Sequence, residues 1–237
     1  MAILTLSRDT LKEFESNGFA LIPNPFSADK IERLTNAIET FRAANTSACS
    51  AGFRNLLSQC PEVREFANSS EAVEIATAIL GKNTKPVRSI FFDKTPASNW
   101  YVTWHQDLSI AVEQRIDTDG FGPWSTKDGV THVQPPKDIL EQIISLRIHL
   151  DPCPKDNGAI KFVAGSHHSG LLDQAEIPGI IERSTPICRT AESGDIILMR
   201  PLILHSSSKS TKPDHRRVLH LEYSSAQLPN GLNWAEA

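Results

Sequence analysis

Hydrophobic positions in the first part of the chain recur at the spacing of amphipathic helices. Over residues 6–40 they predict a helix, a strand and a second helix, because Ser7 can cap the first helix, Gly18 can end it, and the apolar stretch FALIP follows. A third helix is predicted over Glu71–Leu80, which stops at a glycine. The apolar face of the second helix is formed by Ile31, Leu34 and Ile38.

The pattern changes near residue 85 to short runs typical of β-strands. Pro, Gly and Asn separate the runs VRSIFFDK, WYVTWHQD, QIISLRIHL, AIKFVAG, DIILMRPLILH and RRVLHLEYS. Several short strands with turn residues between them predict an all-β sandwich or barrel, with the earlier helices packed outside one sheet. We expect one domain over residues 1–237, with a mostly helical flank at 1–84 and a barrel core at 85–225. Residues 108–137 are predicted to be a long loop that serves as a binding loop or lid.

Composition and charge narrow the class of protein. The 237 residues are 40% hydrophobic and 22% charged, which is ordinary globular usage, and the net charge of -4 gives no basic stripe for nucleic acid. The sequence shows no membrane span and no export signal, and its four scattered cysteines fit reduced thiols. We therefore expect a cytoplasmic protein whose partner is a small molecule, with neither nucleic acid nor membrane involved. Its oligomeric state is not indicated.

A histidine and an aspartate interrupt the apolar stretch WYVTWHQDLSIAV. His105 and Asp107 are two residues apart, so in a strand they would lie on the same face, where a carboxylate is costly unless it is paired or bound to a cation. Either they are two ligands of a metal or they are ordinary polar residues at a strand rim. His205 is the best third ligand, because it ends the apolar run ILMRPLILH where a barrel would open. Two histidines and one carboxylate form the facial triad of non-heme Fe(II) oxygenases.

A dicarboxylate co-substrate of such an enzyme would need a fixed cation. The strand HRRVLHLEYS supplies Arg216 and Arg217 on opposite faces, and arginine binds carboxylates through its planar fork. Arg216 alternates with His220 and Glu222, which suggests a polar barrel interior, whereas Arg217 shares its face with Leu219, Leu221 and Tyr223. We therefore expect Arg216 to be the anchor.

Together these segments resemble the phytanoyl-CoA dioxygenase-like family of Fe(II)/2-oxoglutarate-dependent oxygenases. The resemblance rests on WHQD, NGAIKFVAGSH, GDIILMRPLILHSS and HRRVLHLEY, in that order, and on the earlier GFALIPNPFS. It implies a double-stranded β-helix (jelly-roll, cupin-like) fold, with Fe(II), 2-oxoglutarate and O2 as cofactor and co-substrates. In this family His105, Asp107 and His205 match the iron ligands, while Arg216 and Ser207 match the residues that hold the distal carboxylate of 2-oxoglutarate. Asp107 also distinguishes the chain from the halogenases of the family, which have a small residue there.

Other candidates have two interpretations each. The resemblance places Arg88 and Lys94 beside the co-substrate, although Lys94 could equally be a solvated strand end. Arg147 is either a substrate or co-substrate contact or part of a buried ion pair. Arg54 could reach the substrate mouth or lie on the surface. In the long loop, Trp124 and His132 either line a pocket or anchor the loop.

The sequence therefore predicts a dioxygenase that hydroxylates a small molecule with release of succinate and CO2. One alternative is a non-catalytic barrel that binds a metal and a small molecule. Another is a Zn(II)-dependent hydrolase or isomerase that uses the same three ligands, for which Arg216 would have no co-substrate to hold. The sequence does not identify the substrate.

Overall fold

The computed structural model describes residues 6–45, 52–95, 98–211 and 215–237. Strands form most of the molecule beyond residue 84, and helices dominate before it. The helices are α1 (Arg8–Asn17), α2 (Ala28–Ala44), α3 (Leu56–Gln59), α4 (Pro61–Ala67), α5 (Ser70–Leu80), α6 (Lys137–Leu140), α7 (Ile177–Glu182) and the 3-10 helix η1 (Ser166–Ser169). The strands are β1 (Phe19–Ile22), β2 (Gly52–Arg54), β3 (Lys85–Lys94), β4 (Val102–His105), β5 (Ile110–Val112), β6 (Trp124–Lys127), β7 (Val130–Val133), β8 (Ile143–His149), β9 (Ile160–Phe162), β10 (Ile187–Arg189), β11 (Ile196–Met199), β12 (His205–Ser207) and β13 (Arg216–Ser224).

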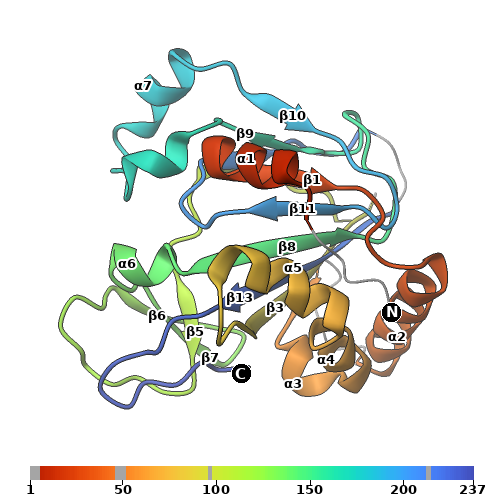
Figure 1. The fold of residues 1–237 in the computed structure, drawn as a ribbon, viewed down its shortest axis with the longest axis horizontal. Coiled ribbons are helices and arrows are strands. Elements are labelled where there is room, and N and C mark those ends of the chain that lie inside the picture. The colour runs from red at the N-terminus through yellow and green to blue at the C-terminus, as the bar shows by residue number, and fades with distance from the viewer. Residues whose placement is uncertain (1–5, 46–51, 96–97, 212–214) are drawn as a thin grey trace.

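Two antiparallel sheets form the body of the molecule (Figure 1). The larger has six strands in the order β1-β11-β8-β13-β3-β2, and the smaller has four in the order β10-β9-β12-β4. Strands adjacent in sequence often lie in different sheets, so the chain crosses repeatedly from one sheet to the other. This arrangement agrees with the predicted double-stranded β-helix. Strands β1 and β2 come from the helical flank and form the two edges of the six-stranded sheet.

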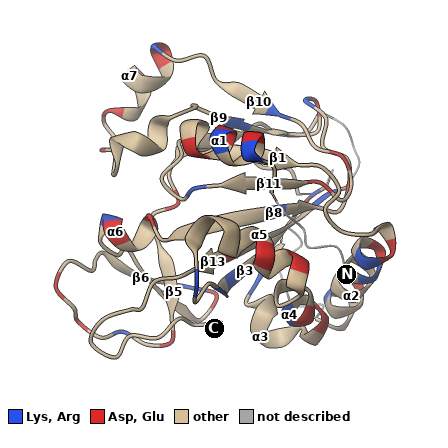
Figure 2. Ribbon diagram, in the orientation of Figure 1, with Lys and Arg blue, Asp and Glu red and all other residues tan. Residues whose placement is uncertain are grey.

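Helices cover the outer face of the six-stranded sheet. The largest apolar cluster joins buried residues of α2, α4 and α5 to the outward side chains of β8, β11 and β13, among them Leu219, Leu221 and Tyr223. The charged residues of α1 and α2 lie on their remaining surface, where both signs of charge occur (Figure 2). The predicted helical face of Ile31, Leu34 and Ile38 is buried in this cluster. These residues form helices because their apolar spacing matches the period of an α-helix.

A second apolar layer fills one end of the space between the sheets. Phe19 of β1 stacks on Phe162 of β9, with ring centroids 4.2 Å apart, and both side chains are buried. Ile197, Met199 and Ile203 complete this layer. Because apolar side chains close this end, polar side chains that point between the sheets gather at the other.

The predicted strand DIILMRPLILH is two strands. Strand β11 ends at Met199 in the six-stranded sheet, and β12 begins at His205 in the four-stranded sheet. Between them the Ile203 amide donates to the carbonyl of Arg200, and Pro201 has no amide to continue a ladder. His205 therefore begins a strand, and the prediction that it ends one was wrong. Buried apolar residues lie on both sides of the crossing, Ile196–Met199 before it and residues 202–204 after it, so hydrophobicity alone did not mark it.

The segment 108–137 is not a structureless loop. It contains a three-stranded antiparallel sheet in the order β5-β7-β6, followed by α6. Ile110, Val112 and Val133 bury their side chains in a cluster with Leu232 and Trp234 of the C-terminal segment. These strands have only three or four residues, so the alternation of apolar and polar side chains within each one was too short to be recognised in the sequence. Their stability depends on contacts with a segment about a hundred positions away.

The described part of the chain contains no helix that is both long and apolar enough to cross a membrane. Three of the four cysteines are free: Cys60 and Cys153 are buried, and Cys188 is partly exposed. Cys49 lies outside the described residues.

Candidate active site

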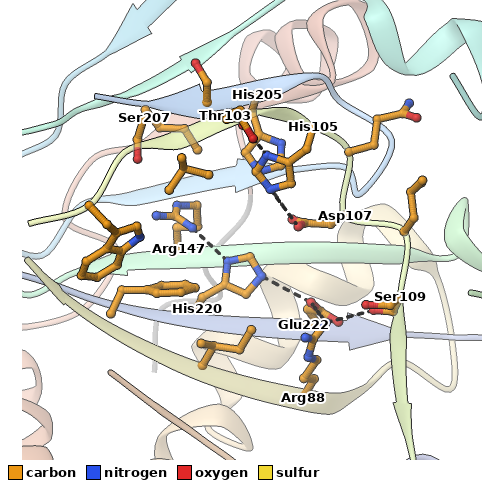
Figure 3. A pocket seen from close by; sticks show the side chains of 18 of the residues that line it. Arg88, Thr103, His105, Asp107, Ser109, Arg147, His205, Ser207, His220 and Glu222 are labelled. Carbon is orange, nitrogen blue, oxygen red and sulfur yellow. Dashed lines mark hydrogen bonds and ion pairs between the residues drawn. The ribbon is translucent and has the colours of Figure 1, made fainter. Parts of the chain in front are cut away.

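Pairing of β4 with β12 brings the predicted metal ligands together. His205 is the direct ladder partner of His105, and their ring centroids are 4.2 Å apart. Asp107 follows β4, where its amide donates to the carbonyl of Pro201 at 2.9 Å. Its two carboxylate oxygens lie 3.6 Å from Nε2 of His105 and 3.7 Å from Nε2 of His205. All three ligand atoms thus lie within 4.8 Å of one another and face a common point (Figure 3).

Both imidazoles are oriented for metal binding by their other ring nitrogen. Nδ1 of His105 lies 2.8 Å from the carbonyl of Thr103, and Nδ1 of His205 lies 2.9 Å from the carbonyl of Ile203. A carbonyl only accepts hydrogen bonds, so each Nδ1 carries the proton and each Nε2 has its lone pair free. Such hydrogen bonds fix metal-ligating histidines in known sites. Two imidazoles and one carboxylate fit Fe(II) and leave further positions on the ion for other ligands.

The electrostatics of these three residues favour an anionic Asp107. Burial raises the pKa of Asp107, but His205 and His105 outweigh it and hold this pKa well below its usual range. Burial lowers the pKa of His205 to about 4, so it is neutral at pH 7. Burial also lowers the pKa of His105, but the hydrogen bond and charge of Asp107 raise it above its usual value. Metal binding requires an anionic carboxylate and neutral imidazoles, so the ion displaces the proton that Asp107 favours on Nε2 of His105.

A second group of polar residues lies where β3, β13 and β12 approach each other. Arg216 is buried and donates from Nη1 to the carbonyl of Gly158, while its Nε has no partner among the described residues. Nζ of Lys94 donates to Oγ of Ser207 at 3.0 Å and to the carbonyl of Ser208 at 2.7 Å. Lys94 is fully buried, so it is not a solvated strand end. Burial, and then the charge of Arg216, lowers the pKa of Lys94 to about 7.

These two groups adjoin one cavity of about 600 Å³, a volume typical of small-molecule sites. His105, Asp107 and His205 lie on one side, and Arg216 and Ser207 also line it. Phe92, Trp100 and Ile160 provide apolar surface. The cavity is therefore large enough for a small co-substrate and a small substrate together.

A chain of polar contacts crosses the floor of the cavity (Figure 3). Arg88 donates to Glu222 at 3.0 Å, and the same oxygen of Glu222 lies 3.5 Å from Nε2 of His220. Nη1 of Arg147 lies 3.2 Å from Nδ1 of His220. Arg147 has no ion-pair partner within the described ranges, so the predicted buried ion pair is not what holds it.

The remaining candidates lie in different places. Arg54 lines the cavity and pairs with Asp128 at 2.5 Å. Trp124 and His132 do not line it: Trp124 packs against the cluster around Trp234, and Nδ1 of His132 faces the carbonyl of Val130. The two residues lie on opposite faces of the β6–β7 hairpin and help to anchor the small three-stranded sheet.

Sequence reasoning did not single out Gln106 or Lys127, and it named Glu222 only as a member of the polar face of Arg216. Gln106 lies between His105 and Asp107 in the sequence. Its side chain donates to the carbonyls of Gly170 and Leu202 and accepts from the amide of Leu172, and these bonds fix the segment that carries the two ligands. Lys127 lines the cavity from the β6–β7 hairpin. Only Glu222 had a recognisable signal, its alternation with Arg216.

Comparison with known families gives one decisive match. The family model described as phytanoyl-CoA dioxygenase (PhyH) matches residues 14–218. The chain belongs to this phytanoyl-CoA dioxygenase family. The family consists of Fe(II)- and 2-oxoglutarate-dependent oxygenases that also use O2, so the chain is a 2-oxoglutarate-dependent oxygenase in class. Comparison with the curated proteins gives no match.

Solved structures confirm the fold expected for this phytanoyl-CoA dioxygenase family member. AviO1 from Streptomyces viridochromogenes Tue57 superposes with a TM-score of 0.71 at 22% identity, over 95% of this chain and 98% of AviO1. The non-heme alpha-ketoglutarate-dependent carbocyclase SnoK from nogalamycin biosynthesis gives 0.75 at 15% identity, over 100% and 89%. EctD from S. alaskensis, solved with 2-oxoglutarate and 5-hydroxyectoine, gives 0.72 at 18% identity, over 92% and 76%.

Proposed function

We propose that residues 1–237 form a single dioxygenase domain that hydroxylates a small molecule and converts 2-oxoglutarate into succinate and CO2. The observation that carries this proposal is the convergence of His105, Asp107 and His205 beside a cavity that the buried Arg216 also lines. A metal site alone fits several activities. A buried cation that pairs with no described carboxylate and lines the same cavity as the metal ligands fits an enzyme that holds a dicarboxylate.

In this proposal each residue has a defined role. Nε2 of His105, Nε2 of His205 and the carboxylate of Asp107 hold Fe(II), and the carbonyls of Thr103 and Ile203 keep both rings in the correct tautomer. When bound, iron supplies the oxidising chemistry that couples 2-oxoglutarate and O2 to oxidation of a C–H bond.

Arg216 and Ser207 bind the distal carboxylate of 2-oxoglutarate. Lys94 donates a hydrogen bond to the Ser207 hydroxyl and thereby fixes its position. A charge-assisted hydrogen bond from a buried guanidinium is strong, because no water competes for the carboxylate. Fixing this end leaves the 2-oxo acid end free to point at the metal ligands. Positioning of this kind is the main contribution of the protein scaffold to the reaction.

The proposal is tested by loading purified protein with Fe(II) and measuring succinate in the presence of 2-oxoglutarate and O2. Even without substrate, we expect slow succinate formation that requires both iron and O2. The non-catalytic alternative predicts 2-oxoglutarate binding with no succinate. A Zn(II)-dependent hydrolase or isomerase predicts no 2-oxoglutarate binding and an activity that persists without O2. Absence of both 2-oxoglutarate binding and succinate would refute the proposal.

A further inference from the structure

Four cationic side chains line the cavity in addition to Arg216. They are Arg54, Arg88, Lys127 and Arg147. Two are neutralised within the protein, since Arg54 pairs with Asp128 and Arg88 pairs with Glu222. Arg147 and Lys127 have no carboxylate within 4.0 Å among the residues that the structure describes. Besides Arg216, the cavity wall therefore carries two positive charges that no described carboxylate neutralises.

Arg147 is held in place without being neutralised. Its side chain is 8% exposed, its Nη1 contacts His220, and its Nε has no acceptor in the described part of the chain. Nδ1 of His220 accepts this bond, so its proton is on Nε2 and faces Glu222. Glu222 is the direct ladder partner of Arg88 and forms an ion pair with it. The negative charge of Glu222 is therefore compensated by Arg88 and not by Arg147. The network thus fixes the guanidinium but leaves one buried donor unsatisfied, which is costly unless a ligand accepts from it.

Lys127 approaches the same cavity from the β6–β7 hairpin. The only side-chain hydrogen bond of Lys127 among the described residues is a long one, from Nζ to Oγ of Ser109 at 3.5 Å. Burial, and then Arg88 and Arg54, lowers its pKa, which indicates a concentration of positive charge at the mouth. Such a field favours the entry of anions.

We propose that the substrate is a small organic anion, whose carboxylate or phosphate is bound by Arg147 and attracted by Lys127. This inference rests on the proposed function, in which both carboxylates of 2-oxoglutarate are already assigned, one to Arg216 and Ser207 and the other to the metal. A further anion is needed for Arg147. Phe92, Ile90 and Trp100 line the cavity beside it and would contact the apolar part of the same molecule. The 600 Å³ cavity restricts the bound part to a few tens of atoms or fewer.

The test uses three probes of similar shape and different charge: benzoate, phenyl phosphate and neutral benzamide. Each is titrated into protein loaded with Mn(II), a paramagnetic substitute, with and without 2-oxoglutarate, at constant ionic strength. Relaxation of the probe protons reports binding close to the metal. We expect at least one of the anions to bind at least tenfold more tightly than benzamide.

Two variants test whether Arg147 and Lys127 are the side chains that bind the anion. Arg147→Gln and Lys127→Gln should each weaken anion binding at least fivefold. Arg115→Gln is the matched control, because Arg115 is exposed and does not line the cavity. Lys127 is exposed on a hairpin, so its variant remains informative if Arg147→Gln does not fold.

The proposal is overturned if neither anion binds more tightly than benzamide, or if neither variant changes anion binding. It is also overturned if Arg147→Gln weakens 2-oxoglutarate binding and spares the anions, which would assign Arg147 to the co-substrate. Binding of 2-oxoglutarate itself is measured separately, so failure of the proposed function is distinguished from failure of the anion site.

Discussion

Lys94 and Arg216 are direct ladder partners on β3 and β13, and both side chains are buried. No described carboxylate pairs with either one. Burial, and then repulsion from the neighbouring Arg216, lowers the pKa of Lys94 to about 7. A bound carboxylate would relieve this repulsion, so the pair is suited to an anionic co-substrate.

The Lys94–Arg216 pair predicts pH-dependent binding of 2-oxoglutarate. In the free protein Lys94 is about half protonated near pH 7, and a bound carboxylate favours its charged form, which raises its pKa. Affinity is therefore highest below pH 7 and falls as the pH rises above it, by about three- to tenfold between pH 7 and 9. Calorimetric titration of Mn(II)-loaded protein measures this change. Lys94→Met should bind more weakly at pH 6.5 and show a flat profile, and an unchanged slope in this variant would contradict the assignment.

Arg216 and Arg217 are neighbours in sequence with opposite roles. Arg216→Met should weaken 2-oxoglutarate binding by about 2–4 kcal/mol, or roughly thirty- to thousandfold, because the carboxylate loses a buried cationic partner. Arg217 pairs with Asp151 and Glu39 on the outer face, so Arg217→Met is the matched control. It should lower the free energy of unfolding and leave 2-oxoglutarate affinity within about twofold. Equal effects of the two variants on binding would exclude Arg216 as the anchor.

Asp107 supplies the only charged ligand atom of the proposed metal site. Asp107→Ala should reduce Mn(II) affinity by at least about a hundredfold and remove succinate formation, because the two remaining imidazoles are neutral donors. Metal titration followed by protein fluorescence measures this loss. Asp117→Ala removes an exposed carboxylate and should change neither quantity. Retention of metal affinity in Asp107→Ala would place the ion elsewhere.

Gly18 connects the helical flank to the barrel and predicts a stability effect. It ends α1 with φ of 80°, and an added Cβ would lie 2.4 Å from Nδ1 of His167. Gly18→Ala should lower the free energy of unfolding by at least about 1–2 kcal/mol from the left-handed conformation alone, with the steric clash in addition. Gly231→Ala is the control, because Gly231 has φ of 78° with open space around it. Denaturant unfolding should show a larger loss for Gly18→Ala, and equal losses would contradict a clash with His167.

Short-range pattern was sufficient for several features of the site. Alternation along β13 correctly placed Arg216 and Glu222 between the sheets and Leu219 against the helices, because side chains in a strand alternate faces whatever the strand pairs with. The two-residue spacing of His105 and Asp107 likewise places their side chains near each other at the end of β4.

Register and crossing points were decided only by the tertiary structure. The sequence did not show that the chain changes sheets between Met199 and His205, since buried apolar residues lie on both sides of the crossing. It did not show that His205 pairs with His105, or that Arg147 faces His220 while no carboxylate reaches it. Pairings of this kind join residues far apart in the sequence, such as Phe19 and Met199, and they depend on how whole sheets pack. The sequence by itself therefore determined the residue types and the faces they occupy, and the packing of the sheets determined which of them meet.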